Sequence, residues 1–244
     1  MTTIECVSAS GRALPPLVMF KAVGPLNTRW IPDGPGVEGW RWTTSNSGWT
    51  NDTLGFEWLE RVFEPCTNTP AASSPSSPPI LRRLLILDGH GSHVKARFVA
   101  FCVCHKIDLM VLPSHTSHKT QPLDVGIFRP LKAALARETD RATTYDHGSI
   151  AKDIWASRLA MARHTALTEH NIHVGWRETG IFPFSPKRLL DKIPSASTSP
   201  STSSRQPLAS LPDNNLEFLR SNSASWSKLS KGTHDINCDG CCGV

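Results

Sequence analysis

An apolar run that ends in an acidic residue, ILRRLLILD at 80–88, constrains the fold of this chain more than any other feature. Such a run is typical of a buried central strand, because both faces of that strand are covered. Residues 94–105 then predict a helix, and residues 107–112 form a second apolar run. A strand, a helix and a strand in succession predict an α/β fold with a parallel pair of strands.

Shorter patterns on both sides of this unit complete the predicted fold. Residues 2–8 and 13–21 are rich in β-formers and predict two strands, with Pro15 and Pro16 tolerated at the start of the second. Residues 24–53 predict long loops with short strands. Apolar residues at helical spacing predict helices at 53–63, 124–138, 149–163 and 172–179, followed by a short helix after Pro186.

Expected helix ends and low-complexity segments set the domain limits. Asn171 and Gly180 are the expected caps of the helix at 172–179. The Ser/Pro-rich stretch at 66–79 is expected to be a disordered insertion, and residues 191–244 a disordered tail. We therefore predict one folded domain over residues 1–190.

Composition excludes several classes of protein. No stretch approaches the roughly 20 apolar residues that a membrane span needs, and residues 1–12 lack the pattern of a secretory signal. Seven scattered cysteines, an odd number in 244 residues, favour a reducing intracellular compartment over a disulfide framework.

The positive charge of the chain is concentrated in its middle. Residues 80–141 hold ten Lys and Arg against five Asp and Glu, an excess equal to the +5 of the whole chain. A local cationic excess favours anionic partners such as nucleic acid, although a solvated helix face is an equally good explanation for any single residue. The candidates for phosphate contact are Lys95, Arg97, Lys119, Arg129 and Lys132.

Two acids occupy positions where catalytic groups gather in α/β folds. Asp88 ends the first apolar run, and Asp124 stands at a loop-to-helix junction after the second. Ligands of open α/β sheets bind beyond the carboxyl ends of the strands, and paired carboxylates there could hold Mg²⁺ or Mn²⁺. The alternative is that Asp88 caps a turn and Asp124 caps a helix.

The blocks LLILDGHGSH and IDLMVLPSHTSHKTQPLDVGIFRPLK resemble the DDE superfamily endonuclease domain of pogo-type, mariner-like transposases. Thirty-five residues separate Asp88 from Asp124, as in the fungal Asp-Asp-35-Asp variant. The resemblance implies a ribonuclease H-like mixed sheet flanked by helices. It also implies Mg²⁺- or Mn²⁺-dependent cutting and joining of DNA, with Asp88 and Asp124 as the second and third catalytic and metal-binding acids. His93 corresponds to a residue that is expected to pack against the metal ligands without binding the metal itself.

The chain also departs from that family. The first catalytic Asp of the family lies on a strand that precedes the block at residues 1–21, and Glu5, Asp33 and Asp52 do not match it. We therefore expect a fold that lacks the first strand and is truncated at its amino terminus. Such a chain is expected to bind metal weakly and to be catalytically inactive.

Other polar and aromatic clusters have plainer explanations. The histidines at 90, 93, 115 and 118 and the cysteines of CDGCC at 238–242 are weak zinc patterns without a complete ligand set. Cys102 and Cys104 are expected to be inert thiols in an apolar helix. Five tryptophans between residues 30 and 58 could stack on bases, but core packing is the more frequent reason for them.

These observations predict a nuclear, DNA-binding, transposase-derived domain that is not a membrane protein and that could form homo-oligomers. The alternative is a domesticated, non-catalytic module that binds DNA or another protein. A small metallohydrolase built on the histidines is a weaker third possibility.

Overall fold

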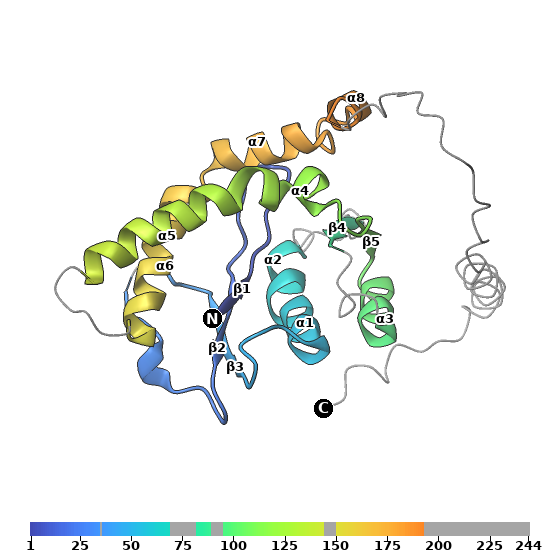
Figure 1. Ribbon diagram of the computed structural model, residues 1–244. Helices are drawn as coiled ribbons and strands as arrows, with labels where there is room; N and C mark the ends of the chain where they lie inside the picture. Colours follow the sequence, from blue (N-terminus) through green and yellow to red (C-terminus); the bar gives the residue numbers. More distant parts are fainter. Residues whose placement is uncertain (35, 69–81, 89–94, 144–149, 193–244) are drawn as a thin grey trace, which may run out of the picture. The chain divides into compact units, whose positions relative to one another are not determined.

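The strands that the structure describes form two small sheets rather than one. The computed structural model describes residues 1–34, 36–68, 82–88, 95–143 and 150–192. Within these ranges, strands and helices make a mixed α/β arrangement (Figure 1). One sheet has the order β1–β2–β3 and the other pairs β4 with β5. The α/β class is therefore confirmed, whereas the described strands do not join into the single mixed sheet that we predicted.

The first sheet is built on a hairpin. Strands β1 (Thr2–Ile4) and β2 (Leu17–Lys21) are antiparallel, and β3 (Arg41–Ser45) pairs parallel to β2. Gly11 has a φ of 87° in the turn between β1 and β2, a conformation that glycine adopts without strain. The strand predicted at 2–8 is thus shorter than expected, and the one at 13–21 begins just after its two prolines. A 3₁₀ turn, η1 (Thr28–Trp30), lies in the β2–β3 connection.

Strand β2 separates two apolar clusters. Its first four residues are at most 1% exposed, and successive side chains of a strand point to opposite faces. Leu17 packs with Trp58, Leu59 and other residues of the first cluster. Val18 and Phe20 belong to the second cluster, which the long helices α5 (Phe128–Thr143) and α6 (Lys152–Ala166) cover. The core therefore has a helical layer on each face of β2.

The second sheet confirms the strand–helix–strand prediction. Strands β4 (Arg83–Leu87) and β5 (Ile107–Val111) are parallel, and helix α3 (Ala96–Cys104) connects them. Leu85 and Leu87 are buried in the first cluster. The prediction that this run is buried on both faces is wrong, because Leu84 on the other face is 55% exposed and β4 pairs only with β5 among the described strands.

A helix with an irregular middle follows β3. Helix α1 (Asp52–Trp58) begins at Asn51, whose Oδ1 accepts the Leu54 N–H at 2.9 Å, as expected of an N-cap. It continues as the π-helical turn η2 (Leu59–Phe63) and then as α2 (Glu64–Thr67), so the helix extends slightly past residue 66. The wide turn ends two residues before Pro65, which cannot donate a helical hydrogen bond. Residues 69–79 of the predicted insertion lie outside the described residues.

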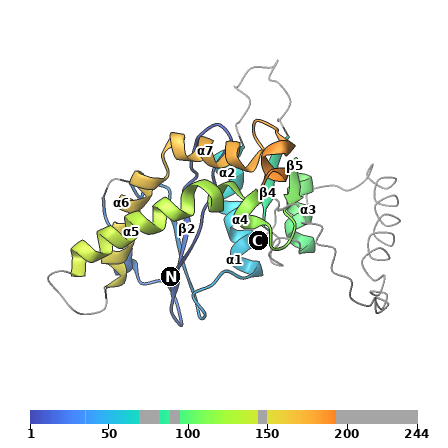
Figure 2. The same cartoon turned by 45° about the horizontal axis from the view of Figure 1, so that its top comes forward.

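The helices after β5 contain a second wide turn. The short α4 (Ser117–Thr120) leads into the π-helical η4 (Leu123–Ile127), which runs directly into α5 (Phe128–Thr143). Pro130 follows η4, as Pro65 follows η2. Helix α6 (Lys152–Ala166) lies beside α5 in Figures 1 and 2. The helices predicted at 124–138 and 149–163 are confirmed with extended or shifted ends.

Helix α7 (Glu169–Thr179) starts three residues earlier than predicted. Thr168, not Asn171, caps it, since the Thr168 Oγ1 accepts the Asn171 N–H at 3.2 Å. The Asn171 side chain instead donates to the Ala166 carbonyl at 2.8 Å. Gly180 ends the helix in the left-handed conformation as predicted, and α8 (Pro186–Leu190) follows.

A buried ion pair ties the first sheet to helix α6. The Arg163 Nε and Nη2 donate to both carboxylate oxygens of Glu5 at 2.7–3.1 Å, and Nη2 also donates to the Leu14 carbonyl at 3.0 Å. The guanidinium carbon lies 4.9 Å from the Trp40 ring centroid. Burial raises the pKa of Glu5 in spite of the opposing effect of Arg163. The paired charges therefore hold β1, the entry to β2 and α6 together.

Two glycines allow η4 and α7 to cross in backbone contact. A Cβ added at Gly126 would lie 2.6 Å from the Gly175 Cα, and a Cβ added at Gly175 would lie 2.5 Å from the Pro122 carbonyl oxygen. These neighbours are backbone atoms and cannot swing aside. Only glycine at both positions permits this approach.

We expect Gly126→Ala and Gly175→Ala each to destabilise the fold by about 1–3 kcal/mol, the usual range for overpacking. In an open helix, alanine in place of glycine would stabilise by up to about 1 kcal/mol. The sign of the change in unfolding free energy, measured by urea denaturation, therefore tests the crossing. Ala136→Gly at an exposed position of α5 is the control for helix propensity. Stabilisation by Gly126→Ala or by Gly175→Ala would contradict the close contact.

We expect Glu5→Gln and Arg163→Met each to destabilise by about 3–5 kcal/mol, because each leaves one buried charge without its partner. The double variant should cost clearly less than the sum of the two. A double-mutant cycle in urea measures this coupling. Additive effects would show that the pair does not act as a unit.

Candidate functional site

The carboxyl edge of the β4–β5 pair holds the first predicted catalytic acid. Leu87 is opposite Val111 in the parallel register, and the Leu112 N–H donates to the Leu87 carbonyl at 2.8 Å. Asp88 is the next residue after β4 and is half-buried. The chain therefore leaves β5 beside the backbone that presents Asp88, at the edge where α/β folds place their ligands.

A hydrogen-bonded turn carries the chain from this edge to the second acid. The Thr116 Oγ1 donates to the Pro113 carbonyl at 2.7 Å and lies 3.0 Å from the Thr120 Oγ1. Asp124 then stands in the first turn of η4, half-exposed. A helix amino terminus favours an acidic side chain there, in agreement with the predicted loop-to-helix junction.

Apolar packing fixes the backbone around Asp124. Ile127 is fully buried with Ile172 and Val7, and Leu123 and Trp176 pack against this group. The glycine crossing described above brings α7 against the same turn. The two crossing glycines were not singled out from the sequence, although a glycine inside a predicted helix, as in HNIHVGWRE, signals a packing requirement.

Two of the five predicted phosphate contacts already have protein partners. The Lys95 Nζ lies 3.3 Å from the Asp52 carboxylate, and the Arg97 guanidinium carbon lies 3.9 Å from the Phe56 ring centroid. The Phe56 ring in turn meets Phe101 edge-on, with 5.5 Å between ring centroids. Lys95 and Arg97 therefore attach α3 to α1.

The other three predicted contacts lie on α4 and α5. Lys119 is half-exposed, and Arg129 and Lys132 are exposed. In the part of the chain that the structure describes, none of them forms an ion pair with an acid. These side chains flank the turn that carries Asp124, and their charges are available to an anionic ligand.

In the ranges that the structure describes, no third acid completes a metal-binding group with Asp88 and Asp124. Glu5 is bound by Arg163, Asp52 pairs with Lys95, and Asp33 is exposed in a loop. Among the described residues, no three His, Cys, Asp or Glu side chains form a group that could hold a metal ion. Two carboxylates do match the oxygen ligands of Mg²⁺, which commonly keeps waters and phosphate oxygens in its remaining positions.

The weaker metal candidates gain no support. His115 and His118 are exposed. His90, His93 and the CDGCC cysteines lie outside the described residues. Cys102 is buried, which raises its pKa to about 12, so its thiol stays protonated as predicted, whereas Cys104 is exposed.

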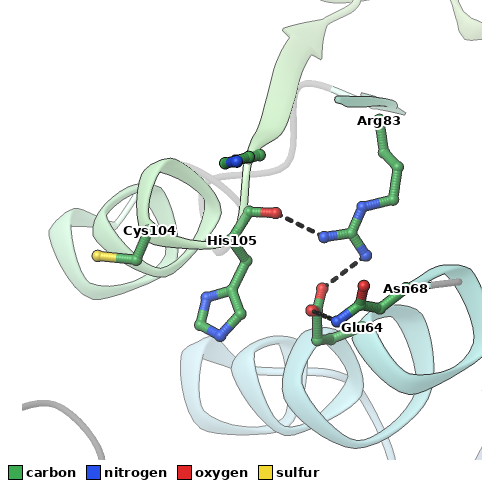
Figure 3. A pocket seen from close by; sticks show the side chains of 6 residues that line it. Glu64, Asn68, Arg83, Cys104 and His105 are labelled. Carbon is green, nitrogen blue, oxygen red and sulfur yellow. Dashed lines mark hydrogen bonds and ion pairs between the residues drawn. The ribbon is translucent and has the colours of Figure 1, made fainter. Parts of the chain in front are cut away.

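A surface hollow lies at the opposite edge of the second sheet (Figure 3). Arg83, at the start of β4, pairs with Glu64 at 2.7 Å and donates to the Thr67 hydroxyl at 3.0 Å. Asn68 and His105 also line the hollow. Arg83 joins α2 to β4. Because Arg83 starts β4 and Asp88 follows the end of that strand, this hollow is separate from the edge that presents Asp88.

The chain is similar to known proteins of one endonuclease family and to several curated proteins. The model of the family described as DDE superfamily endonuclease matches residues 1–176. A protein of Cochliobolus lunatus named MFS-type transporter clz9 is 33% identical over 193 residues, which are 79% of this chain and 20% of that protein. The mouse and human proteins named Pogo transposable element with KRAB domain are each 27% identical over 131 residues, or 54% of this chain and 19% of theirs.

The chain spans about a fifth of the length of these curated relatives. No solved structure matches it. Among the helices that the structure describes, none combines the length and the apolar character needed to cross a membrane. Since the family model covers most of the chain, this protein belongs to the DDE superfamily endonucleases.

Proposed function

We propose that this chain is a DNA-binding, transposase-derived nuclease domain in which Asp88 and Asp124 are the catalytic carboxylates. The observation that carries the proposal is their placement: in a chain of the DDE endonuclease family, Asp88 follows β4 directly and Asp124 lies where the chain re-enters a helix after β5. The likeness to proteins named as pogo transposable elements supports a transposase origin.

Each acid has a defined part in this proposal. Asp88 and Asp124 would supply carboxylate oxygens to Mg²⁺ or Mn²⁺. The chemistry that a bound divalent cation supplies is activation of the attacking oxygen and stabilisation of the leaving oxygen in phosphodiester cleavage. The packing of Ile127 against Ile172 keeps the η4 backbone, and with it Asp124, in a fixed position.

Lys119, Arg129 and Lys132 are the proposed phosphate contacts nearest to Asp124 in the chain. Phosphate contacts position DNA without reading its sequence. Lys95 and Arg97 could add to this surface, but their pairing with Asp52 and Phe56 makes them primarily structural. A DNA substrate implies that the protein acts in the nucleus. A homo-oligomer would place two such sites on one DNA molecule.

The division of the sheet supports a further part of the proposal, that the domain accepts one more strand. Strand β1 pairs only with β2 and strand β4 only with β5, so each has an open edge in the described part of the chain. The two sheets share one apolar cluster, in which Leu17 and Leu85 both take part. A strand between the open edges would join the sheets and could carry the third acid. We infer that residues 1–244 alone do not cleave DNA.

The triple substitution of Lys119, Arg129 and Lys132 by Gln tests the DNA surface. We expect weaker binding to a fluorescein-labelled duplex, measured by anisotropy. The slope of log affinity against log salt concentration is negative, and each lost phosphate contact should make it less steep by about 0.9.

A charge-matched control separates local contact from net charge. Arg177, Arg188 and Lys192 lie 3.3–3.6 Å from the Glu178 carboxylate, so their triple substitution by Gln removes the same formal charge elsewhere. Equal effects of the two triple variants would contradict a defined surface. No binding by the unmodified chain would refute the proposed function.

A second test concerns catalysis. With Mg²⁺ or Mn²⁺ and a labelled duplex, the unmodified chain should release no product above that of Asp88→Asn or Asp124→Asn. DNA binding without cleavage also fits a domesticated, non-catalytic module. Metal-dependent cleavage that Asp88→Asn abolishes would show instead that two carboxylates suffice.

A further inference from the structure

Among the tryptophans that the structure describes, Trp49 alone is largely exposed to solvent. Its side chain is 68% exposed, whereas Trp40 and Trp58 are 8% and 3% exposed. The remaining tryptophans in the described ranges are half-buried. Core packing, the predicted role of the tryptophans between residues 30 and 58, therefore does not explain Trp49.

A well-bonded turn holds this side chain outward. The Ser45 hydroxyl donates to the Trp49 carbonyl at 2.9 Å, and the Trp49 N–H donates to the Ser47 hydroxyl at 3.2 Å. Gly48 has a φ of 76°, and a Cβ there would lie 2.9 Å from the Lys21 Cβ. The turn is thus pressed against the end of β2, and the indole is presented by an ordered backbone.

The contacts of α1 place this turn at the edge of the sheet that presents Asp88. Helix α1 begins just after Trp49, and its Asp52 pairs with Lys95, which immediately precedes α3. Since α3 connects parallel strands, it starts at the carboxyl edge of β4 and ends at the amino edge of β5. The other end of the α1–α2 helix meets Arg83 at the start of β4. Trp49 therefore stands at the same edge as Asp88.

This position combines an aromatic face with nearby positive charge. Lys21 lies beneath Gly48 and is exposed, and the Lys152 ammonium donates to the Lys21 carbonyl at 3.2 Å. An aromatic side chain beside cations is the combination that binds single-stranded nucleic acid, because any base can stack on the ring while the cations meet the backbone. Bases inside a duplex are already stacked, so only an unpaired or extruded base can occupy the ring.

We propose that Trp49 stacks on an unpaired base of the DNA bound at the Asp88 edge. This inference rests on the proposed function and adds to it a preference for DNA with unpaired nucleotides. The test compares two labelled probes, a blunt duplex and the same duplex with a single-stranded 3′ overhang. Anisotropy titrations of both use the full 244-residue chain.

Trp49→Ala should weaken binding to the overhang probe by about 5- to 100-fold, the usual loss for one stacked base. Binding to the blunt duplex should change by less than about twofold. Trp49→Phe, which keeps an aromatic face, should recover most of the loss. Phe184→Ala is the matched control, because Phe184 is an 82% exposed aromatic residue on the α7–α8 connection. It should leave both probes unaffected.

The outcomes separate this inference from the proposed function. If the Lys119, Arg129 and Lys132 variant weakens binding and Trp49→Ala does not, the DNA surface stands and the stacking role is wrong. An equal loss for both probes on Trp49→Ala would also overturn base stacking. If the unmodified chain binds neither probe, both the inference and the proposed function fail. Circular dichroism confirms that each variant is folded.

Discussion

The pairing of Glu5 with Arg163 is the constraint on which the first half of the structure depends. The two residues lie far apart in the chain, yet their side chains meet in the interior with three direct hydrogen bonds. Removing two charges from water is expensive, and the cost is offset only when both are fully bonded. The Leu14 carbonyl and the Trp40 ring complete the surroundings of the guanidinium. Together these contacts hold α6 in place on the hairpin.

The second half of the structure depends on backbone contact instead of charge. At the crossing of η4 and α7 the two helices touch through glycines, and apolar side chains close around them. This contact leaves Asp124 half-exposed on a backbone that is closely packed. The acid after β4 and the acid in η4 are thus supported by different means, one by a strand and the other by a helix crossing.

Local sequence patterns predicted most of the elements. The apolar run at 80–88 correctly predicted the strand that precedes Asp88, and the helical spacing of apolar residues in 124–138 correctly predicted the helix that follows Asp124. The amino terminus of α7 was misplaced because Asn171 and Thr168 are both residues that commonly cap helices. In the structure the Asn171 side chain donates to the Ala166 carbonyl, and Thr168 caps the helix instead.

Tertiary contacts were beyond prediction from local patterns. The partners of Lys95 and Arg97 lie on a helix some forty residues earlier in the chain, so the sequence alone showed only their charge. The exposure of Leu84 follows from the division of the described strands into two sheets. A run of apolar residues does not show which strands will pair. For the same reason Trp49 could not be distinguished from the buried tryptophans around it.

The wide turn η4 also sets the direction of the side chains that follow it. In a regular helix each residue advances about 100°, so residues five apart, such as Asp124 and Arg129, would point about 140° away from each other. A turn closed by a bond from the Phe128 N–H to the Leu123 carbonyl holds one residue more, and it reduces that angle. The extra residue therefore rotates the first cation of α5 toward the side of the helix that carries the acid. If the same residues were wound as a regular α-helix, every side chain would be kept, but Arg129 would point about 140° away from Asp124.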